Sequence, residues 1–243
     1  MFFGCMAKAK KKAATGGAMR RGWRWLRRRI LRAFAIVFLL FVAWVGAYTV
    51  LNPPTTPYMY SEGARLGRVD QDWVKLEDVA GVMARSVVAA EDANFCLHWG
   101  MDTAALRLAL EEGAVRGGST ISQQVAKNVF LWQGRSWARK GLEALMTPVI
   151  EALWTKRRIV EVYLNVIEFD EGVFGVEAAA RHYFGVGPED LSAVQAARLA
   201  AILPNPKVRS AARPSAAMQR KAARIVDGAR TIAADGRAAC FED

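Results

Sequence analysis

Histidine and cysteine are scarce in this sequence, with only two and three residues among 243. This scarcity excludes most zinc frameworks and a small scaffold held together by disulfides. Acidic residues are absent from residues 1–32, which contain eleven lysines and arginines, whereas the remaining chain holds 23 basic and 23 acidic residues. The net charge of +11 therefore belongs to the N-terminal tail. Because a nucleic-acid-binding domain carries its basic charge on a folded face, this distribution indicates no nucleic-acid partner.

An uncharged apolar run follows the basic tail at residues 33–51. A helix of these 19 residues would be roughly 28 Å long, which matches the hydrocarbon thickness of a bilayer. The positive-inside rule places the tail in the cytoplasm and the chain from residue 52 onward outside. A cleaved signal peptide is the alternative, but the run exceeds the ~7–15 apolar residues of such a peptide.

The predicted organisation has four parts: a basic cytoplasmic tail over 1–32, a transmembrane helix over 33–51, a linker over 52–75 and a domain over 76–243. Under this topology Cys96 and Cys240 face an oxidising compartment. The two thiols could pair or remain separate, and the sequence leaves both outcomes open.

Apolar residues at helical spacing dominate the domain, and strand-type alternation is scarce. Start and stop signals predict helices over 78–92, 102–116, 120–131, 136–165, 175–184, 192–203 and 215–234. We expect Pro148 to kink or break the longest helix, and we expect a short strand near 66–74. The fold class is therefore mostly α. The apolar stretch 142–154 is either core or a face that dips into a membrane.

Glu91 ends an apolar helix, where burial and the helix dipole both raise the pKa of a carboxyl group and suit it to general acid or base chemistry. A solvated acid at a helix end is the alternative. Ser119 follows two glycines at the start of the next helix, whose free N–H groups either bind an anion or are simply capped. Gln124 and Lys127 share one face of that helix.

A group of cations follows, at Arg135, Arg139 and Lys140, with Glu143 three residues beyond the last. Such a group is either solvated and ion-paired along the helix or a clamp for phosphate. Two acids, a cation group and an anchored domain together fit glycosyl transfer from a lipid pyrophosphate. That reaction needs a base for the acceptor hydroxyl and cations for the departing pyrophosphate.

The sequence at this point resembles glycosyltransferase family 51, the peptidoglycan polymerases, and in particular its single-domain members. The motifs that carry the resemblance are EDANFCLHWG (91–100), GGSTISQQVAKN (117–128), RKGLEAL (139–145), KRRIVEVYLN (156–165), GVEAAARHYFG (175–185) and LSAVQAARLAAILPNP (191–206). The resemblance implies a mostly α-helical, lysozyme-like domain with two lobes about a cleft.

The resemblance also implies a role for each matching residue. Glu91 would be the general base that activates the acceptor 4-hydroxyl, and Glu143 the second acid. Lys140 and Arg135 would contact the pyrophosphate, with Lys127, Gln124 and Ser119 lining the cleft. Asp92 and His98 are interpreted as structural.

The implied reaction polymerises lipid II into β-1,4 glycan with inversion and release of undecaprenyl pyrophosphate. No cofactor would be tightly bound, and Mg²⁺ or Mn²⁺ would be carried with the pyrophosphate. The expected partners are lipid II, the nascent strand, the membrane, and cell-wall synthesis or division proteins. The expected location is the bacterial inner membrane, with the catalytic domain periplasmic.

The sequence departs mildly from the family pattern at Ser122 and Val160. Val186 stands where the family often has a lysine, which puts one cation contact of the family in doubt. It contains no Ser-x-x-Lys and no Lys-Thr-Gly motif, so we expect no transpeptidase activity. Two alternative functions stay open: a lysozyme-like hydrolase that cuts finished glycan, and a non-catalytic membrane-anchored scaffold.

Overall fold

The computed structural model describes residues 3–103, 107, 111, 118–134 and 136–242 of the chain. The predicted helix over 102–116 lies largely outside the described residues. The chain divides into two compact units, Met1–Ala47 and Tyr48–Asp243. The described residues are mostly helical, which confirms the predicted fold class. The lysozyme-like, two-lobed arrangement stays a prediction.

The first unit is one helix, α1, over Phe3–Ala47. Its part Gly22–Ala47 is long and apolar enough to cross a membrane. The helix ends four residues before the predicted boundary at residue 51, and residues 48–50 form a turn. Pro53 lies just beyond this turn, and helices usually end before the residue that precedes a proline.

The second unit begins with α2, over Pro57–Leu66, where the sequence predicted only a linker and a strand. The hydroxyl of Thr56 accepts a hydrogen bond from the Met59 N–H at 3.1 Å, and Pro57 occupies the first turn, where its missing N–H costs nothing. Gly67 ends the helix with a φ of 86°. The predicted strand over 66–74 is wrong: of that segment, Asp70 alone forms a single bridge, to Val173.

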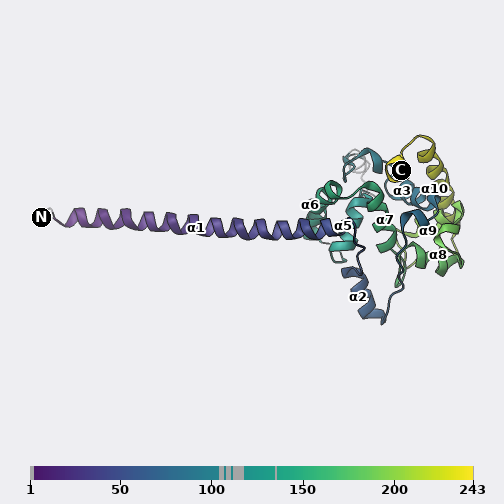
Figure 1. Cartoon of the computed structure of the whole chain (residues 1–243), viewed down its shortest axis with the longest axis horizontal. Helices are drawn as coiled ribbons and strands as arrows, with labels where there is room; N and C mark the ends of the chain where they lie inside the picture. Colours follow the sequence, from purple (N-terminus) through teal and green to yellow (C-terminus); the bar gives the residue numbers. More distant parts are fainter. Residues whose placement is uncertain (1–2, 104–106, 108–110, 112–117, 135, 243) are drawn as a thin grey trace. The chain divides into compact units, whose positions relative to one another are not determined.

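One group of mutually packed helices consists of α3 (Gly81–Glu91), α9 (Ala193–Ile202) and α10 (Ala216–Ala234) (Figure 1). Ser192 and Ser215 cap α9 and α10 through their hydroxyl oxygens, as their positions predicted. The helices α3 and α10 approach closely at Gly228, where an added Cβ would lie 3.3 Å from the Ala89 Cβ.

A second group consists of α5 (Ile121–Phe130), α6 (Trp137–Leu153) and α7 (Lys156–Val166), with α5 packed against the other two. The prediction of one helix over 136–165 is wrong, and so is a break at Pro148; a kink there stays a prediction. Pro148 lies inside α6, and the chain instead breaks at Trp154, after which the Thr155 hydroxyl caps α7. A local N-cap thus decides where the helix ends.

A small antiparallel hairpin, β1 (Glu168–Asp170) with β2 (Val173–Phe174), connects α7 to α8 (Val176–Phe184). The sequence analysis missed these strands, which are too short to show an alternating pattern. Three short 3-10 helices and a final short helix complete the described part of the unit: η1 (Leu76–Asp78), η2 (Phe95–Leu97), η3 (Pro188–Asp190) and α11 (Ala239–Glu242).

Cys96 and Cys240 form a disulfide, with their Cα atoms 5.7 Å apart. The bond joins η2 to α11 across 144 residues of sequence. The outcome that the sequence left open is thereby decided, because only the fold brings the two thiols together.

The apolar stretch 142–154 divides between two environments. Met146 and Ile150 are buried, whereas Leu145 on the same helix is 72% exposed. Leu142 and Leu153 are also exposed. The stretch therefore supplies core on one face and leaves an apolar surface on another.

Candidate active site

Glu91 is the last residue of α3, as predicted, and its side chain is largely buried. Burial raises the pKa of its carboxyl group. The amide of Gln124 donates a hydrogen bond to Glu91 Oε2 at 3.0 Å, and this bond lowers the pKa in part. Within the described part of the chain, Glu91 therefore has a neutral hydrogen-bond donor as its partner and no ion pair.

Tyr163 fixes the orientation of that amide. Its hydroxyl donates to Gln124 Oε1 at 3.2 Å, so the Gln124 nitrogen is the end left to face Glu91. Tyr163 is fully buried on α7, and burial raises the pKa of its hydroxyl well above the ordinary value. The phenol thus stays protonated and keeps donating.

Asp92 and His98 hold the segment that follows Glu91. Asp92 Oδ1 lies 2.8 Å from His98 Nε2, and Asp92 Oδ2 accepts the Ile121 backbone N–H at 3.0 Å. Asp92 is buried, so its carboxylate joins the end of α3 to the start of α5. These bonds support the structural interpretation of both residues.

The start of α5 is capped by side chains of the protein. The Thr120 hydroxyl accepts the Gln123 N–H at 3.3 Å, and Asp92 takes that of Ile121. Ordinary capping, the alternative to anion binding at this helix end, is therefore the arrangement seen for these two amides.

Glu143 is buried on α6 among cations of its own helix. Its carboxylate forms an ion pair with Arg139 and a second with Lys140 at 3.0 Å. Lys140 Nζ also donates to the Ser119 hydroxyl at 2.9 Å. The structure thus brings together Ser119, Lys140 and Glu143, three of the predicted site residues.

Lys127 connects this group to Glu91 electrostatically. Burial lowers the pKa of its ammonium group, the carboxylates of Glu143 and Glu91 raise it, and the nearby cations Arg139 and Lys140 lower it. Lys127 on α5 therefore interacts electrostatically with both acids of the site, Glu91 and Glu143. The predicted position Arg135 lies outside the described residues.

The basic residues of the motif at 156–165, Lys156–Arg158, include two with partners in the fold. Lys156 forms an ion pair with Glu151 at 2.9 Å and donates to the His98 carbonyl at 2.9 Å. Arg158 pairs with Glu161 and donates to the carbonyl of Leu51 at 2.7 Å. Lys156 and Arg158 therefore join neighbouring segments of the fold through ion pairs and hydrogen bonds.

Among the described residues, Asp92, His98 and Asp102 place one ligand atom each within 4.8 Å of one another. Several of their atoms have partners in the fold: Asp92 is bonded to His98 and Ile121, and Asp102 Oδ2 accepts the Asn94 amide at 3.0 Å. His98 Nδ1 is buried and has no hydrogen-bond partner among the described residues.

Comparison with known proteins identifies the family. A family model described as Transglycosylase matches residues 61–230, which is more than half of the chain. The chain belongs to the transglycosylase family. The match extends from α2 to the last turns of α10, so it includes both helix groups that contribute to the site.

Several curated transglycosylases are similar to the chain over most of its length, and each carries the name biosynthetic peptidoglycan transglycosylase. A protein of Jannaschia sp. (strain CCS1) is 58% identical over 216 residues, which are 89% of this chain and 90% of the relative. One from Pseudomonas fluorescens (strain SBW25) is 45% identical, covering 85% of this chain and 89% of the relative. One from Rhodospirillum centenum is 45% identical, covering 90% and 96%.

Sequence reasoning about this transglycosylase missed three residues of the site. Arg139 was seen only as part of a basic group, although its spacing of four residues from Glu143 is a signal for a helical ion pair. Tyr163 and Lys221 carried no such signal, because each reaches the site from a distant segment. The charge on Lys221, on α10, lowers the pKa of Glu91, and its ammonium donates to the Ala201 carbonyl at 3.3 Å.

Proposed function

We propose that this transglycosylase polymerises lipid II into β-1,4-linked glycan, with inversion at the sugar and release of undecaprenyl pyrophosphate. Family membership gives the reaction class, transfer of a glycosyl group, and makes the chain a peptidoglycan glycosyltransferase. The single observation that supports the mechanism is the largely buried Glu91 carboxylate, which accepts a hydrogen bond from the Gln124 amide and whose pKa is lowered by the charges of Lys221 and Lys127.

In the proposed step, Glu91 removes the proton of the acceptor 4-hydroxyl. The acceptor oxygen forms a bond to the anomeric carbon of the donor, and the bond from that carbon to the pyrophosphate oxygen breaks. The leaving pyrophosphate keeps the electron pair. A carboxylate whose pKa is raised by burial is a stronger base than an exposed one, which suits this role.

The cations on α5 and α6 would stabilise the negative charge of the leaving pyrophosphate. Lys140 and Lys127 supply ammonium groups, Ser119 supplies a hydroxyl, and Arg135 is a further predicted contact. Glu143 holds Arg139 and Lys140 in place through its two ion pairs. Mg²⁺ or Mn²⁺ would enter with the pyrophosphate as part of the substrate.

The orientation that we propose puts the N-terminus in the cytoplasm and the catalytic unit in the periplasm. The basic residues that precede the apolar part of α1 support it, and so does the disulfide between Cys96 and Cys240, since such bonds persist in oxidising compartments. The exposed leucines of α6, including Leu145, support contact of the catalytic unit with the bilayer surface.

An impermeant maleimide applied to spheroplasts tests the orientation. We expect labelling of Cys96 and Cys240 only after reduction, and no labelling of Cys5 before lysis. Labelling of Cys5 in intact spheroplasts would reverse the proposed topology.

Incubation of the purified full-length protein with lipid II, and separately with purified sacculi, tests the reaction. We expect glycan polymer and undecaprenyl pyrophosphate from lipid II, and no fragments from sacculi. Fragments from sacculi without polymer would indicate a hydrolase. Inactivity on both substrates would favour a scaffold.

A further inference from the structure

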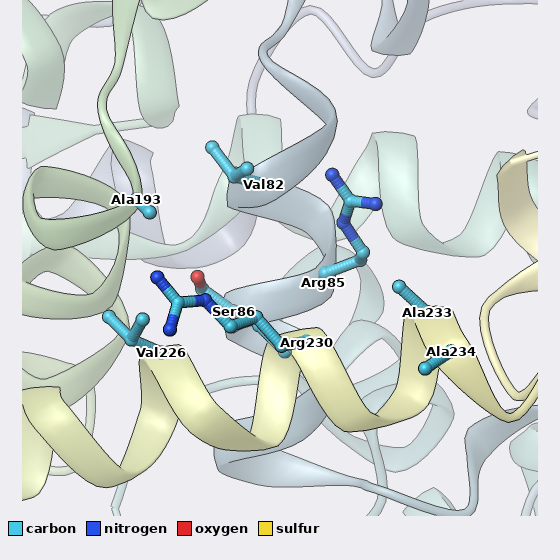
Figure 2. Close-up of a pocket in the computed structure, with 9 residues that line it drawn as sticks. Val82, Arg85, Ser86, Ala193, Val226, Arg230, Ala233 and Ala234 are labelled. Carbon is cyan, nitrogen blue, oxygen red and sulfur yellow. The ribbon is translucent and has the colours of Figure 1, made fainter.

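A pocket of about 430 Å³ lies between α3 and α10, beside the start of α9 (Figure 2). Its volume lies within the range of small-molecule sites in proteins, roughly 300–1,000 Å³. It is separate from the catalytic groups: the α3 residues that line it are Val82, Arg85 and Ser86, whereas Glu91 ends the helix. The rise of a helix puts Arg85 and Glu91 about 9 Å apart along the axis.

The helices α3 and α10 approach closely where Gly228 faces Ala89, and the pocket is lined by α10 residues on both sides of Gly228. Apolar residues line most of it: Val82, Ala193, Val226, Ala229, Ala233 and Ala234. Such a surface fits a short aliphatic group and offers it little steric hindrance.

Two arginines give the pocket a positive charge. Arg85 comes from α3 and Arg230 from α10, and Figure 2 shows both guanidinium groups among the lining side chains. None of the lining residues is acidic. Arg85 has a partner in Glu242 at 3.4 Å, whereas Arg230 forms no ion pair with any residue that the structure describes. Guanidinium groups match carboxylates in charge and in geometry.

We propose that this pocket binds a carboxylate carried on a short aliphatic body. The carboxylate pairs with Arg230, and with Arg85 on the opposite wall, while the aliphatic body covers the alanines and valines. Both parts of the ligand are needed, because Arg230 is exposed and hydrated before a ligand binds, so an ion pair with it adds affinity only together with burial of the aliphatic body. The binding is independent of the glycosyl transfer proposed above.

Three probes separate the two contributions: hexanoate, 1-hexanol and acetate. The full-length protein is placed in nanodiscs with ¹³C-methyl alanine, and the signals of Ala229, Ala233 and Ala234 report on the pocket. We expect hexanoate to shift these signals saturably and to bind about two- to fivefold more tightly than 1-hexanol, as for an ion pair at an exposed site. It should bind at least about tenfold more tightly than acetate, which lacks the aliphatic body.

The variant Arg230→Gln should weaken hexanoate binding by about two- to fivefold. Arg220→Gln is the matched control, because Arg220 is an exposed arginine of the same helix that does not line the pocket. Ala233→Leu fills the pocket and should abolish the hexanoate shifts of Ala229 and Ala234. Absence of saturable shifts in the wild-type protein, equal binding of 1-hexanol, or equal weakening by both arginine variants would overturn the proposal.

Discussion

The end of α3 and the first half of α6 each place one buried acid at the site, and the two acids have different surroundings. Glu143 on α6 has two cations of its own helix in direct contact, Arg139 and Lys140. Among the residues that the structure describes, Glu91 on α3 has one hydrogen-bond partner, the neutral amide of Gln124, while the charges of Lys127 and Lys221 act on it without a direct bond.

This difference in surroundings suits the two carboxylates to different functions, one to positioning cations and the other to accepting a proton. A carboxylate bonded to two cations has its charge compensated, so it is suited to holding those cations in position. A carboxylate with only an amide partner retains lone pairs that can take a proton. We therefore expect changes at Glu91 to affect the chemical step, and changes at Glu143 to affect the arrangement of the cations.

The largest expected effect belongs to Glu91→Gln, which keeps the shape of the side chain and removes the base. Turnover of lipid II should fall by about 10²–10⁴-fold, with little change in lipid II binding.

Glu143→Gln should lower turnover and also weaken binding of the donor, because Arg139 and Lys140 lose their shared partner. For the Glu91 and Glu143 variants, steady-state kinetics measure the turnover and a binding assay measures the affinity for the lipid substrate. Glu77→Gln, an exposed acid outside the site, is the control, and unchanged turnover in Glu91→Gln would exclude Glu91 as the base.

Lys140→Ala should reduce kcat by about 10²–10³-fold and affect lipid II binding less, because the pyrophosphate gains charge in the transition state. Lys140→Arg, which keeps the charge, should recover part of the rate. Comparison of kcat with the dissociation constant tests this. A defect in binding alone would contradict the role given to Lys140.

The pH dependence of turnover should report on Glu91. Since the base acts as a carboxylate and burial raises its pKa, activity should decline as the pH falls through that raised pKa. Lys221→Met removes a positive charge that lowers this pKa, so the acidic limb should move to higher pH. Lys221→Arg should restore it. A limb that stays in place in Lys221→Met, or that moves equally in the exposed control Arg220→Met, would disprove the coupling.

The smallest expected effect is that of Tyr163→Phe. Without the hydroxyl, the Gln124 amide loses the bond at 3.2 Å that orients it, and its oxygen can turn toward Glu91. An oxygen there disfavours the carboxylate, so the acidic limb should again move to higher pH, with about a two- to tenfold loss of kcat for one hydrogen bond. Thermal unfolding of the variant distinguishes a direct effect on the pH profile from a loss of stability. A lower stability with an unchanged pH profile would assign Tyr163 a purely structural role.

Local signals predicted several helices well. The helices over 192–203 and 215–234 were placed within a residue or two, since Ser192 and Ser215 form caps with their own neighbours. Prediction failed in two ways. The helix-breaking signal of Pro148 was overridden, since this proline was accommodated within α6. The helix-start signal of Thr56 and Pro57 was not recognised, although it begins α2 at residue 57.

By itself, the sequence determined the helical class, the apolar segment near the N-terminus, the motifs that place the chain in its family, and Glu91 at a helix end. These features depend on residues near one another in the chain, where spacing is sufficient information. Only the tertiary structure decided the disulfide, the contact of Tyr163 with Gln124, the charge that Lys221 brings to Glu91, and the pocket between α3 and α10. Each of these joins segments far apart in sequence, and their meeting depends on how the helices pack.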